Sequence, residues 1–262
     1  MIASPAGGGG SPRIVLLTTP SVMSNAATRH FIRAMGSRIA LVGTSNPARR
    51  SAGGITGQLR KQLARSGPRI LPYLALGFGI PHRLFGPATL DIDDVNGPVA
   101  REAIAAVRPD LIVTLHFDQI LAADTIALAR LGGINLHPSL LPRHRGPVPA
   151  FWGLLEGATG VSVHRLVTRI DAGEVLAQRE VTLPPGISAL DASRRLHLAG
   201  VPLLVEVVAR FAAGPVPHVT PPAPLPYCPF PDAATLRAAA RRGVRLVRVR
   251  DITLLQPGRV PD

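Results

Sequence analysis

Short apolar runs recur along the first half of the chain, separated by longer segments whose apolar positions follow helical spacing. Apolar runs without polar alternation are typical of strands buried on both faces. The pattern predicts such strands at residues 13–19, 38–43, 110–115 and 132–137. It predicts helices at residues 24–34, 98–107 and 122–130, with Ser24 or Asn25 as the first N-cap. This alternation predicts an α/β fold, with a mostly parallel sheet and helices on both faces.

The second half of the chain continues the pattern and then changes in composition. Strands are predicted at residues 160–167 and 174–183, and helices at residues 150–156 and 189–213. Pro202 lies inside the last helix and predicts a kink or two pieces. Prolines crowd residues 214–231, before a basic helix at 233–242 and a strand-like run at 244–255. We expect a flexible leader at residues 1–12, one main domain at 13–213 and an extension at 214–262.

Charge and cysteine content indicate which partners and which cellular compartment to expect. The net charge is +13, almost all of it from arginine, because Lys61 is the single lysine. The arginines are dispersed without interleaved aromatic residues, a pattern also typical of GC-rich coding sequence, so nucleic acid is not the expected partner. The lone Cys228 fits a reducing compartment, and we expect the cytoplasm. No stretch reaches the roughly 18–20 uninterrupted apolar residues that span a bilayer.

The apolar stretch at residues 70–85 permits two interpretations. It contains two prolines and two glycines, so it is too broken to cross a membrane. It can form a buried helix pair that packs on the sheet, or a surface for a partner, a lipid or an acceptor. The sequence leaves both open.

The most informative polar residues lie where the strand at 132–137 ends. Asn135 and His137 are two residues apart, so both side chains point to the same side of that strand. Pro138 cannot continue a central strand, so the chain must leave the sheet there. Open α/β sheets place their chemistry at this edge. Asp171 follows in the turn Ile170-Asp171-Ala172-Gly173.

An amide, an imidazole and a carboxylate suit the transfer of an acyl group to an amine. Asn135 and a protonated His137 can stabilise the oxyanion that forms when the amine attacks a carbonyl carbon. A neutral His137 can accept the proton of the amine, and Asp171 can raise its affinity for that proton. The alternative is structural, because strand-end polar groups and Asp-Ala-Gly turns often satisfy only backbone.

Other candidates for chemistry are weaker. Ser139 is not in a Gly-x-Ser-x-Gly elbow, so it is not expected to be a nucleophile. His116, His144 and His164 show no zinc-ligand spacing with a third partner, so no metal site is expected. Cys228 has no paired histidine nearby in sequence and is expected to be inert.

Two motifs resemble the folate-dependent formyltransferases, which include the glycinamide ribonucleotide, methionyl-tRNA and amino-sugar enzymes. They are INLHPSLLPRHRG at residues 134–146 and TGVSVHRLVTRIDAGEVLAQ at residues 159–178, and the second is most similar to the amino-sugar type. The resemblance covers residues 13–213, with clear motifs from about residue 110 to 183. It implies a Rossmann-like formyltransferase domain and one-carbon transfer from 10-formyltetrahydrofolate, without a metal.

The resemblance also implies roles for individual residues. Asn135, His137 and Asp171 match the catalytic trio of the family. The folate-binding segments match Phe117, Gln119, Ile120, Leu121, Leu166, Val167, Thr168 and Arg169. The acceptor is expected to contact Ser139, Arg145 and Trp152. The run His116-Phe117-Asp118-Gln119 departs from the small and basic residues usual in the family.

The resemblance leaves the acceptor open and favours a small amine, such as an amino sugar or a natural-product amine. Residues 18–25 lack the glycine-rich turn that cradles phosphate in the purine enzyme. The residues after 213 are too few for the C-terminal barrel of the methionyl-tRNA enzymes. A methionyl-tRNA formyltransferase without that domain, and a non-catalytic folate-binding protein, are the alternatives. The oligomeric state stays open, with a homodimer as one option.

Overall fold

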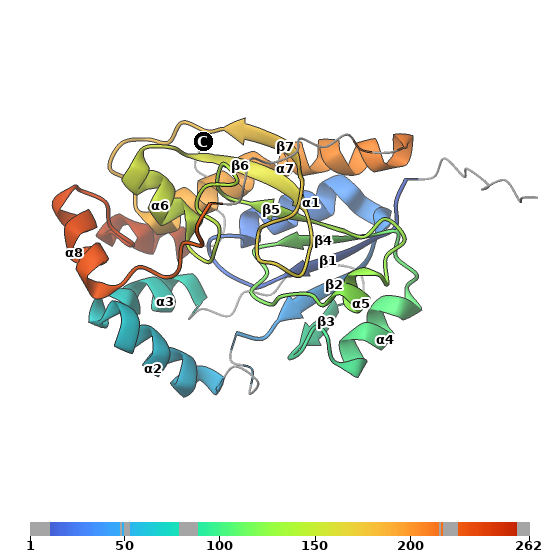
Figure 1. Cartoon of the computed structure of the whole chain (residues 1–262), viewed down its shortest axis with the longest axis horizontal. Coiled ribbons are helices and arrows are strands. Elements are labelled where there is room, and N and C mark those ends of the chain that lie inside the picture. The colour runs from blue at the N-terminus through green and yellow to red at the C-terminus, as the bar shows by residue number, and fades with distance from the viewer. Residues whose placement is uncertain are drawn as a thin grey trace, which may run out of the picture.

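A single twisted sheet forms the centre of the protein (Figure 1). The computed structural model describes residues 11–47, 49, 53–78, 89–214, 216 and 225–255. The strands follow the order β3-β2-β1-β4-β5-β6-β7 across the sheet. Their bounds are β1 Ile14–Thr18, β2 Ile39–Ser45, β3 Thr89–Ile92, β4 Leu111–Leu115, β5 Gly133–His137, β6 Gly160–Arg165 and β7 Val175–Glu180.

The sheet is parallel from β3 to β5 and antiparallel beyond it. β5 pairs with β4 in parallel, and with β6 in antiparallel register. β7 then pairs with β6 as an antiparallel edge strand. Because β5 is the last parallel strand, the side chains at its carboxyl end meet residues of β4 on one side and of β6 on the other. The prediction of a mostly parallel α/β sheet is confirmed.

Helices cover both faces of the sheet, as the apolar runs predict. The helices are α1 Asn25–Met35, α2 Gly54–Ser66, α3 Leu71–Phe78, α4 Pro98–Ala106, α5 Ala123–Ile126, α6 Pro149–Glu156, α7 Ala189–Ala213 and α8 Ala233–Arg241. Alternate side chains of β1 divide the core: Ile14 and Leu16 join the cluster under α1 and α7, whereas Val15 and Leu17 join the one under α4. Strands buried on both faces must be apolar throughout, which explains the continuous runs.

Several local predictions need correction. The helix expected at 122–130 is only α5, because the chain then tightens into turns such as Ala129 N–H to the Ile126 carbonyl. No strand forms at the described residues 244–255, and the chain makes a 3-10 turn at Val249–Leu255. Ser24 is the N-cap residue of α1, as predicted, but its side chain does not cap the helix, because its Oγ donates to the Thr19 carbonyl. Asn25 is the first residue of the helix, and its Oδ1 accepts from Ser21 N–H.

The longest helix, α7, is continuous through Pro202, so the prediction of two pieces is wrong. Pro202 lies on the exposed side of the helix, where water can bind the carbonyl that its ring leaves unpaired. By length and composition alone, α7 is also the one helix of the described residues that could cross a membrane. Its apolar face packs on α1, β6 and β7 in the core of the protein.

The C-terminal segment packs against α3 and α6, one before and one after the first motif in the sequence. Leu236 and Ala239 of α8 join Tyr73 of α3 and Phe151 of α6 in a separate apolar cluster. The described part of the stretch at 70–85 therefore packs on helices rather than on the sheet. Residues 79–85 lie outside the described residues. The strand β3 and the helix α2 were not predicted from the sequence.

Gly200 sets how closely α7 approaches β5. A Cβ atom at Gly200 would lie 2.6 Å from Cδ1 of Leu136, which is buried in the strand between Asn135 and His137. We expect Gly200→Ala to lower the free energy of unfolding by about 1–3 kcal/mol, because the extra methyl overpacks the core. Equilibrium denaturation in urea measures this change. A midpoint equal to that of the parent protein would contradict the tight contact.

Candidate active site

Asn135 is held in one orientation by its neighbours on both sides. Thr114 of β4 donates its hydroxyl to Asn135 Oδ1 at 2.7 Å, and His164 of β6 lies with Nε2 3.0 Å from Asn135 Nδ2. The other ring nitrogen of His164 lies 2.9 Å from the Arg165 carbonyl, which can only accept, so Nδ1 carries the proton. When the ring is neutral, Nε2 of His164 therefore accepts one amide N–H, and a ring that gains a proton at Nε2 faces the carboxylate of Asp171. The second N–H of Asn135 is left for another partner.

The Asp171 carboxylate connects the three predicted catalytic residues. Its Oδ1 lies 3.6 Å from Nδ1 of His137 and 3.6 Å from Nε2 of His164, and its Oδ2 accepts the N–H of Gly146 at 2.9 Å. Asp171 itself has a φ of 46°, a left-handed conformation that is uncommon outside glycine. The structure thus brings Asn135, His137 and Asp171 together from two separate motifs.

Electrostatics at this cluster hold Asp171 ionised and act in opposing directions on His137. Burial would raise the pKa of Asp171, but His137, His164 and the Gly146 N–H outweigh it and hold that pKa well below its ordinary value. Burial lowers the pKa of His137, and the Asp171 carboxylate acts in the opposite direction. Nε2 of His137 lies 3.2 Å from the His144 carbonyl. Nδ1 of His137 faces the Asp171 carboxylate, so a proton taken up at Nδ1 is stabilised by that charge.

Arg145 holds the Asp171 turn in place. Its Nε donates to the carbonyls of Ile170 and Asp171 at 3.0 and 3.1 Å, and its Nη1 donates to the Leu225 carbonyl at 3.2 Å. The side chain is buried. Because these donors are engaged by backbone, the expected contact between Arg145 and the acceptor finds no support in this arrangement.

Ser139 and Trp152 also make structural contacts. The Ser139 hydroxyl donates to the Arg143 carbonyl at 2.8 Å, and the side chain is buried. Trp152 donates Nε1–H to the Pro229 carbonyl at 3.1 Å and meets the Phe151 ring edge-on. The position of Ser139 does not support the expected contact with an acceptor. Trp152 connects α6 to the C-terminal segment.

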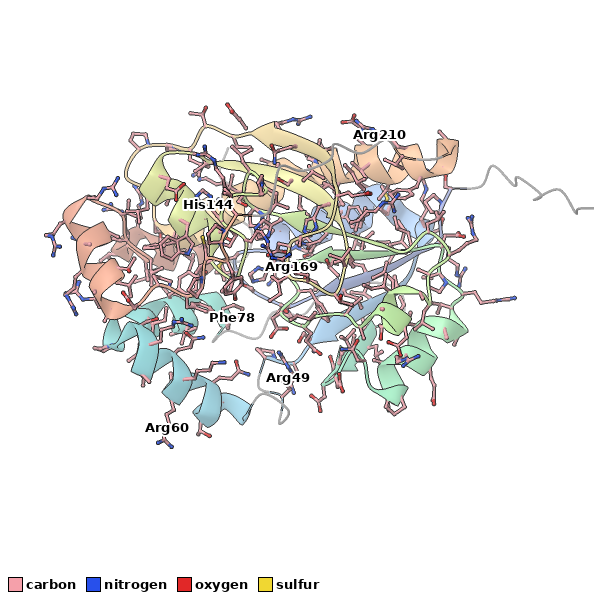
Figure 2. All side chains as sticks on the ribbon, viewed as in Figure 1. Arg49, Arg60, Phe78, His144, Arg169 and Arg210 are labelled. Atoms are coloured by element: carbon pink, nitrogen blue, oxygen red, sulfur yellow. The ribbon has the colours of Figure 1, made fainter. Side chains whose placement is uncertain are left out.

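The two segments expected to bind folate lie at the ends of β4 and β6. In the first, Gln119 is engaged, because its amide donates to Ser45 Oγ at 2.8 Å and accepts from Val95 N–H at 2.9 Å. Phe117, Leu121 and Leu166 pack into the core under α4. The exposed side chains are Ile120, Val167, Thr168 and Arg169, the last labelled in Figure 2 on the loop between β6 and β7.

His164 is the functional candidate that sequence reasoning missed. The alternation of Val161, Ser162, Val163 and His164 places the two polar side chains on the face opposite to the valines. Antiparallel pairing then sets His164 directly against Asn135. The alternation was visible in the sequence, but the pairing partner was not. Among the described residues, no group of three His, Cys, Asp or Glu side chains is arranged to hold a metal ion.

A second pair of histidines lies beside the site, with His197 buried and His116 half-buried. His116, which follows β4 directly and has a φ of 54°, stacks on Phe78 and meets the ring of His197 edge-on at 5.2 Å. Burial lowers the pKa of His116 to about 4 and that of His197 to about 3. His197 Nδ1 lies 2.7 Å from the Ser193 carbonyl, so the neutral ring carries its proton there.

This pair predicts that the protein loses stability in mild acid. The unfolded chain takes up a proton on each ring near pH 6.5, whereas the folded chain does so only near pH 4 for His116 and pH 3 for His197. Between these values the free energy of unfolding should fall by up to about 1.4 kcal/mol per pH unit for each ring. His197→Phe should make the fall less steep, and His30→Phe, at an exposed position of α1, is the control. Urea titrations from pH 7 to pH 4 measure both slopes; equal slopes would contradict the assignment.

Residues 72–208, just over half of the chain, match the family model described as formyl transferase. The chain belongs to the formyl transferase family. The matched range includes Asn135, His137, His164 and Asp171 and every strand from β3 to β7. Membership confirms the resemblance drawn from the two sequence motifs.

Solved structures similar to this formyl transferase show the same fold. A likely sugar N-formyltransferase from Mycobacterium tuberculosis is 19% identical, with a TM-score of 0.55 and coverage of 84% of this chain and 75% of that one. A sugar N-formyltransferase from Shewanella sp. is 16% identical, with a TM-score of 0.56 and coverage of 86% and 78%. Phosphoribosylglycinamide formyltransferase from Brucella melitensis is 25% identical, with a TM-score of 0.52 and coverage of 80% and 100%.

Proposed function

We propose that the protein transfers a formyl group from 10-formyltetrahydrofolate to the primary amine of a small acceptor, an amino sugar or a natural-product amine, in the cytoplasm. The observation that carries this proposal is the meeting of Asn135, His137 and Asp171 at the carboxyl end of β5. Sugar N-formyltransferases among the similar structures support the choice of acceptor.

The exposed residues of the two loops fit a folate. Ile120 on the loop after β4, and Val167 and Ile170 on the loop after β6, are 52%, 43% and 36% exposed. Large apolar side chains in such positions favour contact with a flat heteroaromatic ring such as the pterin. Gln119 is engaged with the protein, so we leave its side chain out of the folate site and assign the contacts to Ile120, Val167 and the backbone of both loops.

Each residue around the site has its own role in the transfer of the formyl group. The bound folate supplies an activated formyl carbon for attack by the amine. Asn135 offers its free N–H to the oxygen on which negative charge develops, while His164 keeps the amide in that orientation. His137 accepts the proton that the amine loses, and Asp171 stabilises the imidazolium that results. His137 can return that proton to N10 of the folate as the bond from N10 to the formyl carbon breaks, so that tetrahydrofolate leaves.

A screen of amines tests the proposal. The protein is incubated with 10-formyltetrahydrofolate and a panel of amino sugars, nucleotide-linked amino sugars, simple amines and charged initiator tRNA, and products are analysed by mass spectrometry. We expect the mass gain of one formyl group on a small amine, and no gain with the Asp171→Asn variant. Formylation of the tRNA alone would favour the methionyl-tRNA alternative. Folate binding without formylation of any amine would support the non-catalytic alternative.

A further inference from the structure

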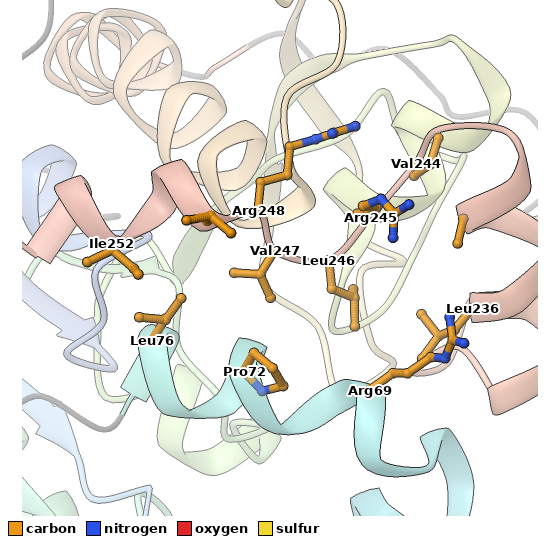
Figure 3. Close-up of a pocket in the computed structure, with 12 residues that line it drawn as sticks. Arg69, Pro72, Leu76, Leu236, Val244, Arg245, Leu246, Val247, Arg248 and Ile252 are labelled. Carbon is orange, nitrogen blue, oxygen red and sulfur yellow. The ribbon is translucent and has the colours of Figure 1, made fainter.

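A groove lies between α3, α8 and the segment that follows α8, away from the candidate active site (Figure 3). Its volume is about 640 Å³. This is within the range of roughly 300–1,000 Å³ that small-molecule pockets occupy. None of the residues that line it belongs to the strands or loops that carry Asn135, His137 and Asp171.

The greater part of the groove is apolar. Leu76 of α3, and Leu246 and Val247 after α8, form the wall, and Ile252 of the last turn is 57% exposed at its edge. Val249 next to it is 86% exposed. Apolar side chains gathered at a concave surface favour an apolar ligand over water.

The polar part of the groove carries only positive charge. No acidic residue lines it, and the side chains of Arg69 and Arg245 have no hydrogen-bond or ion-pair partner within the described part of the chain. Arg248 is different, because its Nη2 donates to the Gly243 carbonyl at 2.7 Å. In Figure 3, Arg69 and Arg245 lie toward one end, near Leu236, and the apolar side chains of Leu76 and Ile252 lie toward the other.

We propose that this groove binds one molecule of an anionic amphiphile. The two free guanidinium groups would hold a carboxylate or phosphate head by charge-assisted hydrogen bonds. The hydrocarbon chain would lie along Val247 toward Leu76 and Ile252. The separation of charge from apolar surface selects this chemistry. A sugar would leave the apolar end of the groove in contact with water, and a neutral lipid would leave both arginines without a counter-charge.

Calorimetric titration with defined amphiphiles tests the proposal. Sodium dodecanoate and dodecyl phosphate, each below its critical micelle concentration, should bind with one molecule per chain. Dodecyltrimethylammonium keeps the chain but reverses the charge, and hexanoate keeps the head but shortens the chain. Both should bind at least about tenfold more weakly than the two anionic amphiphiles. The tighter of those two identifies the head group. Equal binding of the cationic amphiphile, or binding only to anionic phospholipid vesicles, would overturn the proposal.

Substitutions in the groove locate the binding. The double variant Arg69→Gln/Arg245→Gln should weaken dodecanoate binding by at least about tenfold. Its matched control is Arg237→Gln/Arg241→Gln, which removes the same charge from exposed positions of α8 outside the groove. Equal weakening in both, or none in the first, would overturn the proposal. Sedimentation of the parent and of Ile252→Glu adds a further test, because a dimer lost in that variant would show that a second copy occupies the groove.

Discussion

Replacing Asp171 with asparagine is expected to lower kcat for formyl transfer by about 10²–10⁴-fold. The Asp171 carboxylate faces Nδ1 of His137 at 3.6 Å and is the charge that raises the proton affinity of that buried ring. Without it, burial is the largest remaining influence on the pKa of His137, and the ring becomes a weaker base for the proton of the amine. Steady-state assays with the acceptor that the mass screen identifies measure this loss.

The asparagine substitution removes the charge of Asp171 and should keep the structure of its turn. The new amide would keep an oxygen to accept the Gly146 N–H, so the turn should hold and the midpoint of thermal unfolding should change little. Asp124→Asn is the matched control, because it removes a carboxylate that is largely exposed and paired with Arg101. A kcat within about threefold of the parent would remove Asp171 from the mechanism.

Gly173→Ala is expected to damage both stability and activity. A Cβ at this position would lie 1.9 Å from the Arg165 carbonyl oxygen, so the backbone of β6 or of the turn must move. That carbonyl accepts the Nδ1 proton of His164, and His164 in turn orients the Asn135 amide. We expect a loss of about 2–3 kcal/mol in the free energy of unfolding and a clear fall in kcat.

The matched control for this substitution is Gly97→Ala at the start of α4. Its nearest neighbour would be the Asp94 carbonyl at 3.3 Å, so the strain should be small. Urea denaturation reports stability, and a titration of folate binding reports whether the loop after β6 is intact. If Gly173→Ala unfolded at the same urea concentration as Gly97→Ala, the close approach to Arg165 would be disproved.

Strands and long helices could be predicted because their signals are local. β1, β4 and β5 are apolar runs that only a doubly covered sheet buries, and the bounds of α7 follow from its apolar length. The prediction failed at 244–255, where alternating valines and arginines read as a strand. The Arg245 and Leu246 carbonyls accept N–H groups at the start of α7 rather than those of a strand, and the apolar side chains of the segment pack on α3 and α8.

The site was predicted only in part because its geometry depends on pairing. Asn135, His137 and Asp171 were selected by residue type and motif. Arg145 has a structural role because it binds backbone carbonyls of the Asp171 turn, and the sequence does not indicate which carbonyls surround it. His164 was considered only as a metal ligand, because nothing local indicated that β6 would pair with β5 in antiparallel register.

The sequence by itself determined the α/β class, the strand that carries Asn135 and His137, and the family to which the motifs point. These depend on local periodicity and on residues adjacent along the chain. The tertiary structure alone decided that Asp171 reaches His137, that His164 orients Asn135, and that Arg69 and Arg245 share a groove with Ile252. Such contacts join residues far apart in sequence, and packing sets the distances between them.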